Sequence, residues 1–231
     1  MHESVIFKSK KEVKLRAKIT FLVLFTFCAS LSFSFETVKN LRLSAEGIEK
    51  LEIDCGAGFL HLSGNDSLNT IEVEAEIIVK GKSEKDMEEY VKKKVELDLK
   101  KQGNKAILIS KFDDGFSFDN FRTRVINLTV KIPKNMDLYI DDGSGEIHIR
   151  DIQGDVSIED GSGSIEVTDV FGNLFIDDGS GTIDVRNVEQ NVKVDDGSGS
   201  ITIDGVGGDV IIEDDGSGSL KVHNVKGKVI K

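Results

Sequence analysis

Residues 163–180 of the sequence are GSIEVTDVFGNLFIDDGS, and the residues that follow, 181–198, are GTIDVRNVEQNVKVDDGS. The two segments align without a gap, and the same spacing continues on both sides of them. The second glycine of each GSG recurs every 18 residues, with one inserted residue before the last; these glycines are Gly145, Gly163, Gly181, Gly199 and Gly218. A fixed period of this length is typical of architectures in which each repeat stacks on the next.

Each repeat consists of two halves of nine residues that follow the pattern G-x-Φ-x-Φ, where Φ is aliphatic. In an extended chain Ile165 and Val167 point to one side and Glu166 points to the other. Strands this short are stable only when each coil pairs with the coils above and below it, roughly 4.8 Å away. The sequence therefore predicts an all-β fold, a parallel β-helix with about 18 residues per coil. One interior row is expected to hold Ile147, Ile165, Ile183, Ile201 and Leu220.

The two turns of each coil differ in composition. One turn carries an apolar residue that is predicted to fill a rounded corner: Ile152, Val170, Val188, Val206 and Val225. The other is a glycine turn that begins with an aspartate: Asp142, Asp160, Asp178, Asp196 and Asp215. Each aspartate is predicted to accept a hydrogen bond from a backbone N–H just ahead of it, as in an Asx turn. A similar capping role is predicted at the apolar corner for Asp151, Asp169, Asn187, Gly205 and Asn224.

A second acid precedes the turn aspartate in every coil: Asp141, Glu159, Asp177, Asp195 and Asp214. Stacked like charges are destabilising, so turn formation alone does not explain this row. Two interpretations remain open. The acids form a solvated edge that discourages aggregation, or they bind cations, with Ca²⁺ favoured because it takes several oxygen ligands. The candidate metal ligands are Asp141, Asp142, Asp160, Asp177, Asp178, Asp195, Asp196, Asp214 and Asp215. The known Ca²⁺-binding nonapeptide is not matched, so no cofactor is expected, with Ca²⁺ as the alternative.

The first residues are predicted to form a secretory signal, residues 1–34. Residues 8–18 are rich in lysine and arginine, residues 19–33 are uncharged and mostly apolar, and small serines follow. Loss of residues 1–32 would remove six basic and two acidic side chains and change the formal charge from −11 to −15. Such a charge disfavours nucleic acid, and membrane contact is expected only through an uncleaved signal. The mature chain would contain one cysteine, Cys55, and no intramolecular disulfide.

Residues 35–140 are predicted to form a β-rich capping part of the domain, and residues 141–231 form the regular DDGSG-repeat β-helix. LEIDCGAGFLHLSG, residues 51–64, resembles a worn coil in which Cys55 is a structural thiol. One helix is expected near residues 83–98, where apolar residues have helical spacing. The phenylalanine-rich segment 112–124 is expected to be a loop packed on the cap, with an exposed patch for a partner as the alternative.

These features resemble a bacterial family of exported β-helical domains called "putative adhesin", a domain of unknown function. The resemblance rests on the signal segment, on LTVKIPKNMDLYIDDGSG at residues 128–145 and on the repeated halves with SG turns, and it covers roughly residues 40–231. It implies a right-handed parallel β-helix, export to the periplasm or cell surface, and no catalytic site.

Three classes of function follow. The favoured one is a non-enzymatic cell-envelope protein that acts in adhesion or scaffolding. The alternatives are a Ca²⁺-dependent structural or assembling β-solenoid and a polysaccharide-active β-helix enzyme. The enzyme is disfavoured because the coils carry no long loops and because His148 and His223 lie several coils apart. The partner is expected to be an unidentified envelope or surface component, with self-association through the uncovered last coil as a further expectation.

Overall fold

The computed structural model describes residues 33–81, 83–113 and 123–231. Most of the predicted signal and most of the phenylalanine-rich segment lie outside these residues. The strands are β1 (Phe33–Ser44), β2 (Lys50–Asn65), β3 (Thr70–Gly81), β4 (Val95–Gln102), β5 (Lys105–Phe112), β6 (Thr123–Pro133), β7 (Asp137–Ile152), β8 (Val156–Asp160), β9 (Gly163–Val170), β10 (Leu174–Asp178), β11 (Gly181–Val188), β12 (Val192–Asp196), β13 (Gly199–Val206), β14 (Val210–Asp214), β15 (Leu220–Val225) and β16 (Val229–Ile230). The helix is α1 (Glu84–Lys94).

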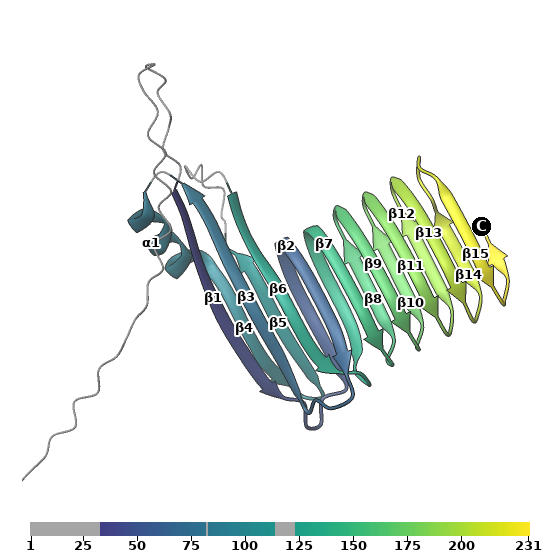
Figure 1. Cartoon of the computed structure of the whole chain (residues 1–231), viewed down its shortest axis with the longest axis horizontal. Helices are drawn as coiled ribbons and strands as arrows, with labels where there is room; N and C mark the ends of the chain where they lie inside the picture. The colour runs from purple at the N-terminus through teal and green to yellow at the C-terminus, as the bar shows by residue number, and fades with distance from the viewer. Residues whose placement is uncertain (1–32, 82, 114–122) are drawn as a thin grey trace, which may run out of the picture. The chain divides into compact units, whose positions relative to one another are not determined.

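From β7 onward the chain alternates between two faces of a solenoid (Figure 1). Face A consists of the first half of β7 followed by β8, β10, β12, β14 and β16, all parallel. Face B consists of the second half of β7 followed by β9, β11, β13 and β15, also parallel. Apolar side chains from the inner sides of both faces form the core between them. The predicted parallel β-helix is therefore confirmed.

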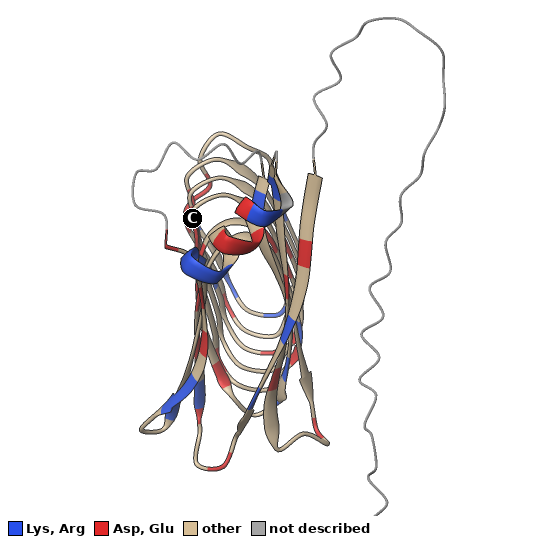
Figure 2. Ribbon diagram, turned by 90° about the vertical axis from the view of Figure 1, so that its left-hand side faces the viewer, with Lys and Arg blue, Asp and Glu red and all other residues tan. Residues whose placement is uncertain are grey.

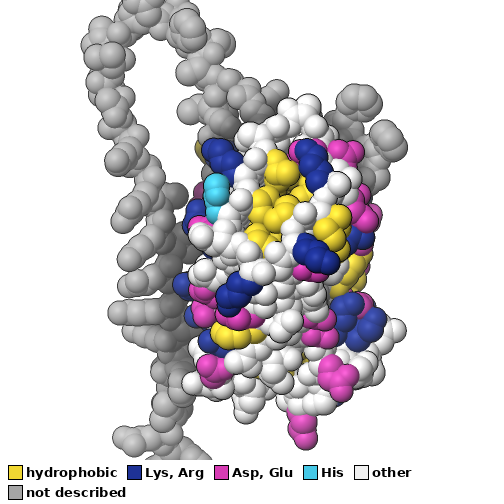
Figure 3. Space-filling view, turned by 90° about the vertical axis from the view of Figure 1, so that its right-hand side faces the viewer, with side chains coloured by type: hydrophobic (Ala, Val, Ile, Leu, Met, Phe, Trp, Pro, Cys, Tyr) yellow, Lys and Arg dark blue, Asp and Glu magenta, His cyan; other side chains and the backbone are white. Residues whose placement is uncertain are grey.

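The predicted interior row is also confirmed. Ile147 pairs with Ile165, Ile165 with Ile183, Ile183 with Ile201, and Ile201 with Leu220. The four isoleucines are buried, and Leu220 is half-buried in the last coil. Figure 3 looks onto that end of the solenoid and shows hydrophobic side chains surrounded by charged ones. Val229 and Ile230 of β16 are exposed there.

Parallel stacking extends toward the N-terminus beyond residue 141, where the regular repeat begins. The whole of β2 is a coil, because its first half pairs with β7 on face A and its second half pairs with β7 on face B. On its other side β2 pairs in parallel with β5 and with β6. Antiparallel partners then extend each face: β4 joins β5 on face A, and β3 and β1 join β6 on face B.

Helix α1 covers the N-terminal end of the core (Figure 2). It begins after Ser83, whose hydroxyl accepts the Asp86 N–H at 3.4 Å, and it buries Met87, Tyr90 and Val91. The helix ends at Lys94, so the prediction that it reaches residue 98 was wrong. The reason is that residues 95–102 alternate in polarity and pair with β5 as an antiparallel strand. No helix among the described residues has the length and apolar character needed to cross a membrane.

The apolar corner owes its residue types to backbone conformation and not to the predicted capping. Asp151, Asp169, Asn187 and Asn224 have φ of 64°, 59°, 58° and 52°, and Gly205 in the same row has φ of 79°. This left-handed region is open to glycine and is tolerated by Asn and Asp. The side chains also bond to one another, since Asn187 Nδ2 donates to Asp169 Oδ1 at 2.9 Å.

We expect Asn187→Ala to lower the free energy of unfolding by about 1–2 kcal/mol, because alanine is disfavoured in the left-handed region. Asn187→Gly should cost much less, since glycine occupies the equivalent position at residue 205 in the next coil. Urea unfolding of both variants measures the difference. Equal losses would mean that the side-chain hydrogen bond, and not the backbone conformation, selects the residue.

Candidate functional site

The two acids of each glycine turn form separate rows, because neighbouring residues of a strand point to opposite sides. The turn aspartate of each pair, called the inner acid below, points inward. The exposed fractions of Asp142, Asp160, Asp178 and Asp196 are 5, 6, 1 and 0%. The acid that precedes it in the sequence points outward. Asp141, Glu159 and Asp177 are exposed, and Asp195 is half-buried. A pair of consecutive acids therefore does not converge on one point. The prediction that these acids bind a cation stays a prediction.

The inner acids form the predicted Asx turns. Asp160, Asp178 and Asp196 accept the N–H of the serine two residues ahead through Oδ1, at 3.2, 3.0 and 3.1 Å. In the last coil the acceptor is Asp214, which binds the Gly216 N–H at 2.9 Å, so the role predicted for Asp215 was wrong. The inserted residue causes an irregularity in the pairing of β12 with β14, beyond which Asp195 pairs with Asp214 as the repeat predicts, so the changed acceptor is confined to the turn itself. Asp215 accepts Lys231 Nζ at 2.6 Å instead.

The second carboxyl oxygen of the inner acids is poorly satisfied. The Oδ2 atoms of Asp160, Asp178 and Asp196 are buried and have no hydrogen-bond partner among the described residues. Burial raises the pKa of Asp142, Asp160 and Asp178 to about 6, and the negative charge of nearby carboxyl groups adds to this effect. Burial also raises the pKa of Asp196. These carboxyls thus hold protons at a pH where exposed aspartates are ionised.

Cys55 occupies the first position of the inner row. It pairs in register with Asp142, and its thiol is hydrogen-bonded to that carboxyl. Burial, together with the acids around it, raises the pKa of the Cys55 thiol far above its ordinary value. A thiol that stays protonated is a poor nucleophile, which agrees with the predicted structural role.

A groove of about 490 Å³ runs along face A. One side consists of the outward row Ser157, Phe175, Lys193 and Ile211, which lie in register on successive coils. The other side is a ladder of Asp137, Asp155, Asn173 and Asn191. Each ladder side chain accepts the backbone N–H of the equivalent residue one coil further on, at 2.7–3.3 Å. Lys193 Nζ lies 5.4 Å from the centre of the Phe175 ring. The groove is therefore a rigid strip that combines apolar, amide and cationic groups.

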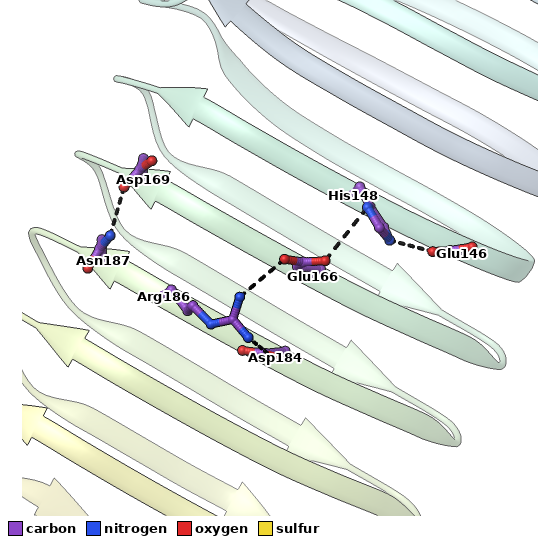
Figure 4. Close-up of polar contacts among 7 residues, drawn as sticks. All are labelled: Glu146, His148, Glu166, Asp169, Asp184, Arg186 and Asn187. Carbon is purple, nitrogen blue, oxygen red and sulfur yellow. Dashed lines mark hydrogen bonds and ion pairs between the residues drawn. The ribbon is translucent and has the colours of Figure 1, made fainter.

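A second groove, of about 550 Å³, lies on face B. It contains His61 of β2 and His148 of β7, which pair in register and whose ring centres are 4.8 Å apart. Glu146 Oε1 lies 2.5 Å from His148 Nε2, and Glu166 Oε2 lies 3.7 Å from His148 Nδ1 (Figure 4). Burial lowers the pKa of His61, as does the nearby His148.

The described residues contain one group of three histidine, cysteine or acidic side chains whose ligand atoms lie within 4.8 Å of one another: His61, Glu146 and His148. None of the acids proposed from the sequence as metal ligands belongs to it.

The Toastrack DUF4097 family model matches residues 40–229. The chain belongs to the Toastrack family. This membership agrees with the resemblance inferred from the repeats and with the β-helix that the structure contains. No curated protein matches the chain.

Several solved structures are similar to this Toastrack chain at low identity. One, described as a "putative cell adhesion protein" from Clostridium sporogenes, is 14% identical, with 85% of this chain and 99% of that chain covered and a TM-score of 0.46. "Putative adhesins" from Parabacteroides distasonis and Bacteroides fragilis are each 13% identical. Each comparison covers 84% of this chain and 96% of the other chain, and the TM-scores are 0.32 and 0.33. Similarity at this level says nothing about the ligand of this chain.

The histidine pair of this Toastrack domain was missed in the sequence, although a signal for it was present. In the worn coil at residues 51–64, Asp54 to Gly58 stand where the repeats have Asp-Asp-Gly-Ser-Gly. The same alignment continued by three residues places His61 opposite His148, as the structure does. His148 and His223, the two histidines of the regular repeats, lie on β7 and β15 and are not neighbours.

Proposed function

We propose that this Toastrack domain is an exported, non-enzymatic binding scaffold of the adhesin type, which holds a component of the cell envelope or cell surface against face A. The observation that carries the proposal is the groove on face A, in which outward side chains of successive coils form one continuous strip. A strip of this kind suits an extended ligand that spans several coils, because each coil offers a contact at the same position.

The groove supports binding in two ways. Phe175 and Ile211 offer apolar contact area, and Lys193 adds a cation beside them. The strip is also held in place, since every coil is fixed to the next by backbone pairing and by the Asp and Asn ladder. A preformed surface loses little conformational entropy on binding. Export is supported by the basic and apolar segment at residues 8–33.

The test is adherence of the purified, fluorescently labelled chain to isolated cell envelopes of the bacterium that encodes it. Phe175→Ser combined with Lys193→Glu is expected to reduce bound protein at least tenfold. Phe171→Ser is the matched control, because Phe171 is 51% exposed in the same coil but lies outside the groove. It should leave adherence unchanged.

Thermal melts of each variant check that folding is intact. Failure of the unaltered chain to adhere would overturn the proposal. An equal loss in the Phe171 control would also contradict it, because binding would then not depend on face A.

A further inference from the structure

We propose that His61, Glu146 and His148 bind a divalent transition-metal ion of the zinc class on face B. The three residues come from two strands, β2 and β7, that lie side by side. His61 and His148 line the groove on face B, and the Glu146 carboxylate lies beside His148 on the same outward side. The proposal is independent of ligand binding on face A.

The backbone dictates the cluster. β2 and β7 pair in parallel and in register from Ala57 with Ser144 to Ser63 with Arg150, so His61 and His148 stand directly opposite one another. Glu146 precedes His148 by two residues and therefore points to the same side of the strand. Phe59 pairs with Glu146, and its ring stacks on His61 with the ring centres 4.2 Å apart. This contact restricts the rotation of the His61 imidazole.

The distances suit an ion after small side-chain movements. Zinc bonds to histidine nitrogen and carboxylate oxygen are about 2.1 Å, which places tetrahedral ligand atoms roughly 3.4 Å apart. The three ligand atoms lie within 4.8 Å of one another. Glu146 and His148 are close, at 2.5 Å, and would separate slightly. All three side chains are partly exposed, so small rotations about the side-chain bonds of Glu146 and His148 can supply these shifts while His61 stays stacked on Phe59.

The donor set selects the kind of ion. Two imidazoles and one carboxylate are typical of zinc and of neighbouring transition metals, whereas Ca²⁺ and Mg²⁺ prefer oxygen ligands alone. Three protein ligands leave one position for water.

Glu166 fits a supporting role. Its Oε2 lies 3.7 Å from His148 Nδ1, and its other oxygen, Oε1, lies 3.4 Å from Arg186 Nη1 (Figure 4). A carboxylate that accepts the Nδ1–H of a metal-bound histidine orients the ring and raises its affinity for the metal. Glu166 is therefore a positioning residue in this proposal, and Arg186 holds it.

The experiment is isothermal titration calorimetry of the purified, chelator-treated chain with ZnCl₂, and with CaCl₂ as the comparison ion. We expect one zinc site per chain and no calcium binding on face B. His61→Gln and His148→Gln should each weaken zinc binding at least tenfold. Glu166→Gln should weaken it by roughly tenfold or more, as expected for an orienting carboxylate. His223→Gln is the matched control, because His223 is an exposed outward histidine of face B outside the cluster.

A second measurement does not depend on variants. Titration with Co²⁺ should give the intense visible absorption of a four-coordinate site, and Zn²⁺ should displace it. Absence of zinc binding, unchanged binding in His61→Gln, or an equal loss in His223→Gln would each overturn the proposal. None of these results bears on adherence through face A, which is tested separately.

Discussion

Gly181→Ala is expected to lower the free energy of unfolding by more than about 4 kcal/mol, a loss that few single substitutions cause. Gly181 begins β11 and packs directly against Gly163 of the coil before it. A Cβ atom at residue 181 would lie 1.6 Å from the carbonyl oxygen of Gly163, and that distance is far inside van der Waals contact. The obstructing atom belongs to the backbone of a paired strand, so no side-chain rotation relieves the overlap.

The matched control for this prediction is Gly103→Ala. Gly103 has φ of +67°, but a Cβ atom there would meet no other atom within 4 Å. Its replacement should therefore cost only the strain of the left-handed region, about 1–2 kcal/mol. Urea unfolding curves of the two variants distinguish the cost of the atomic overlap at residue 181 from the cost of backbone strain at residue 103. A loss at residue 181 no larger than the loss at residue 103 would show that neighbouring coils move apart easily and would contradict the rigid stacking described above.

The repeated glycines also explain why the regular coils were predictable from sequence. Such a close approach admits no side chain, so the same glycine recurs at residues 145, 163, 181 and 199. Alternation then fixes the inward residues, and the interior row with Ile165 follows directly. The last glycine turn was harder to predict, because one inserted residue interrupts the pairing of β12 with β14 there and Asp214, not Asp215, accepts the hydrogen bond of the turn.

Features that depend on distant pairing were less accessible. The end of α1 is decided by β5, which draws residues 95–102 into a strand, and the local pattern does not contain that partner. The Asp and Asn residues of the apolar corner suit both an Asx turn and a positive φ, and only the backbone angles distinguish them. The histidine cluster required β2 to be recognised as a complete coil. Its nearest clue, the worn turn around Cys55, keeps the outer acid as Asp54 but has a cysteine in place of the inner aspartate that marks the other turns.

The second large effect concerns pH. The melting temperature of the chain is expected to rise by about 5 °C or more when the pH falls from 7 to 5, since such a change corresponds to roughly 1–2 kcal/mol for a chain of this size. The inner row supplies the reason. The pKa of Asp142, Asp160 and Asp178 is raised from 3.8 to about 6 in the folded chain.

The direction of the effect follows from proton binding. Between pH 4 and pH 6 the folded chain holds protons on these carboxyls that the unfolded chain has released, so acidification favours folding. Their stabilising contribution is complete below about pH 4 and is lost as the pH rises through 6. Glu52, Glu88 and Glu89 act in the opposite direction, because lysine partners lower the pKa of each. Their contribution is lost below about pH 4.5, so stability should be greatest near pH 5.

Other groups change charge over the same range, and a pair of variants isolates the inner row. Asp178 is 1% exposed and faces the carboxyls of Asp160 and Asp196, whereas Asp177 is exposed. Asp178→Asn removes one buried charge and keeps the oxygen that accepts the Ser180 N–H. It should raise the melting temperature at pH 7 and flatten its dependence on pH. Asp177→Asn changes the net charge equally and should leave the dependence on pH close to that of the unaltered chain.

The same melting experiment with added calcium tests the alternative interpretation, in which the acids of the glycine turns bind cations. The unpartnered oxygens of Asp160, Asp178 and Asp196 would become ligands if a cation entered the turn, and binding would then stabilise the folded chain by mass action. At pH 7, millimolar CaCl₂ would raise the melting temperature beyond NaCl of equal ionic strength, and Asp178→Asn would abolish the gain. We expect no such gain, because the two acids of each turn point to opposite sides of the strand. If calcium gives no specific stabilisation and only Asp178→Asn flattens the dependence of the melting temperature on pH, the experiment supports proton binding by the inner acids. Equal pH profiles in the two variants would refute that role.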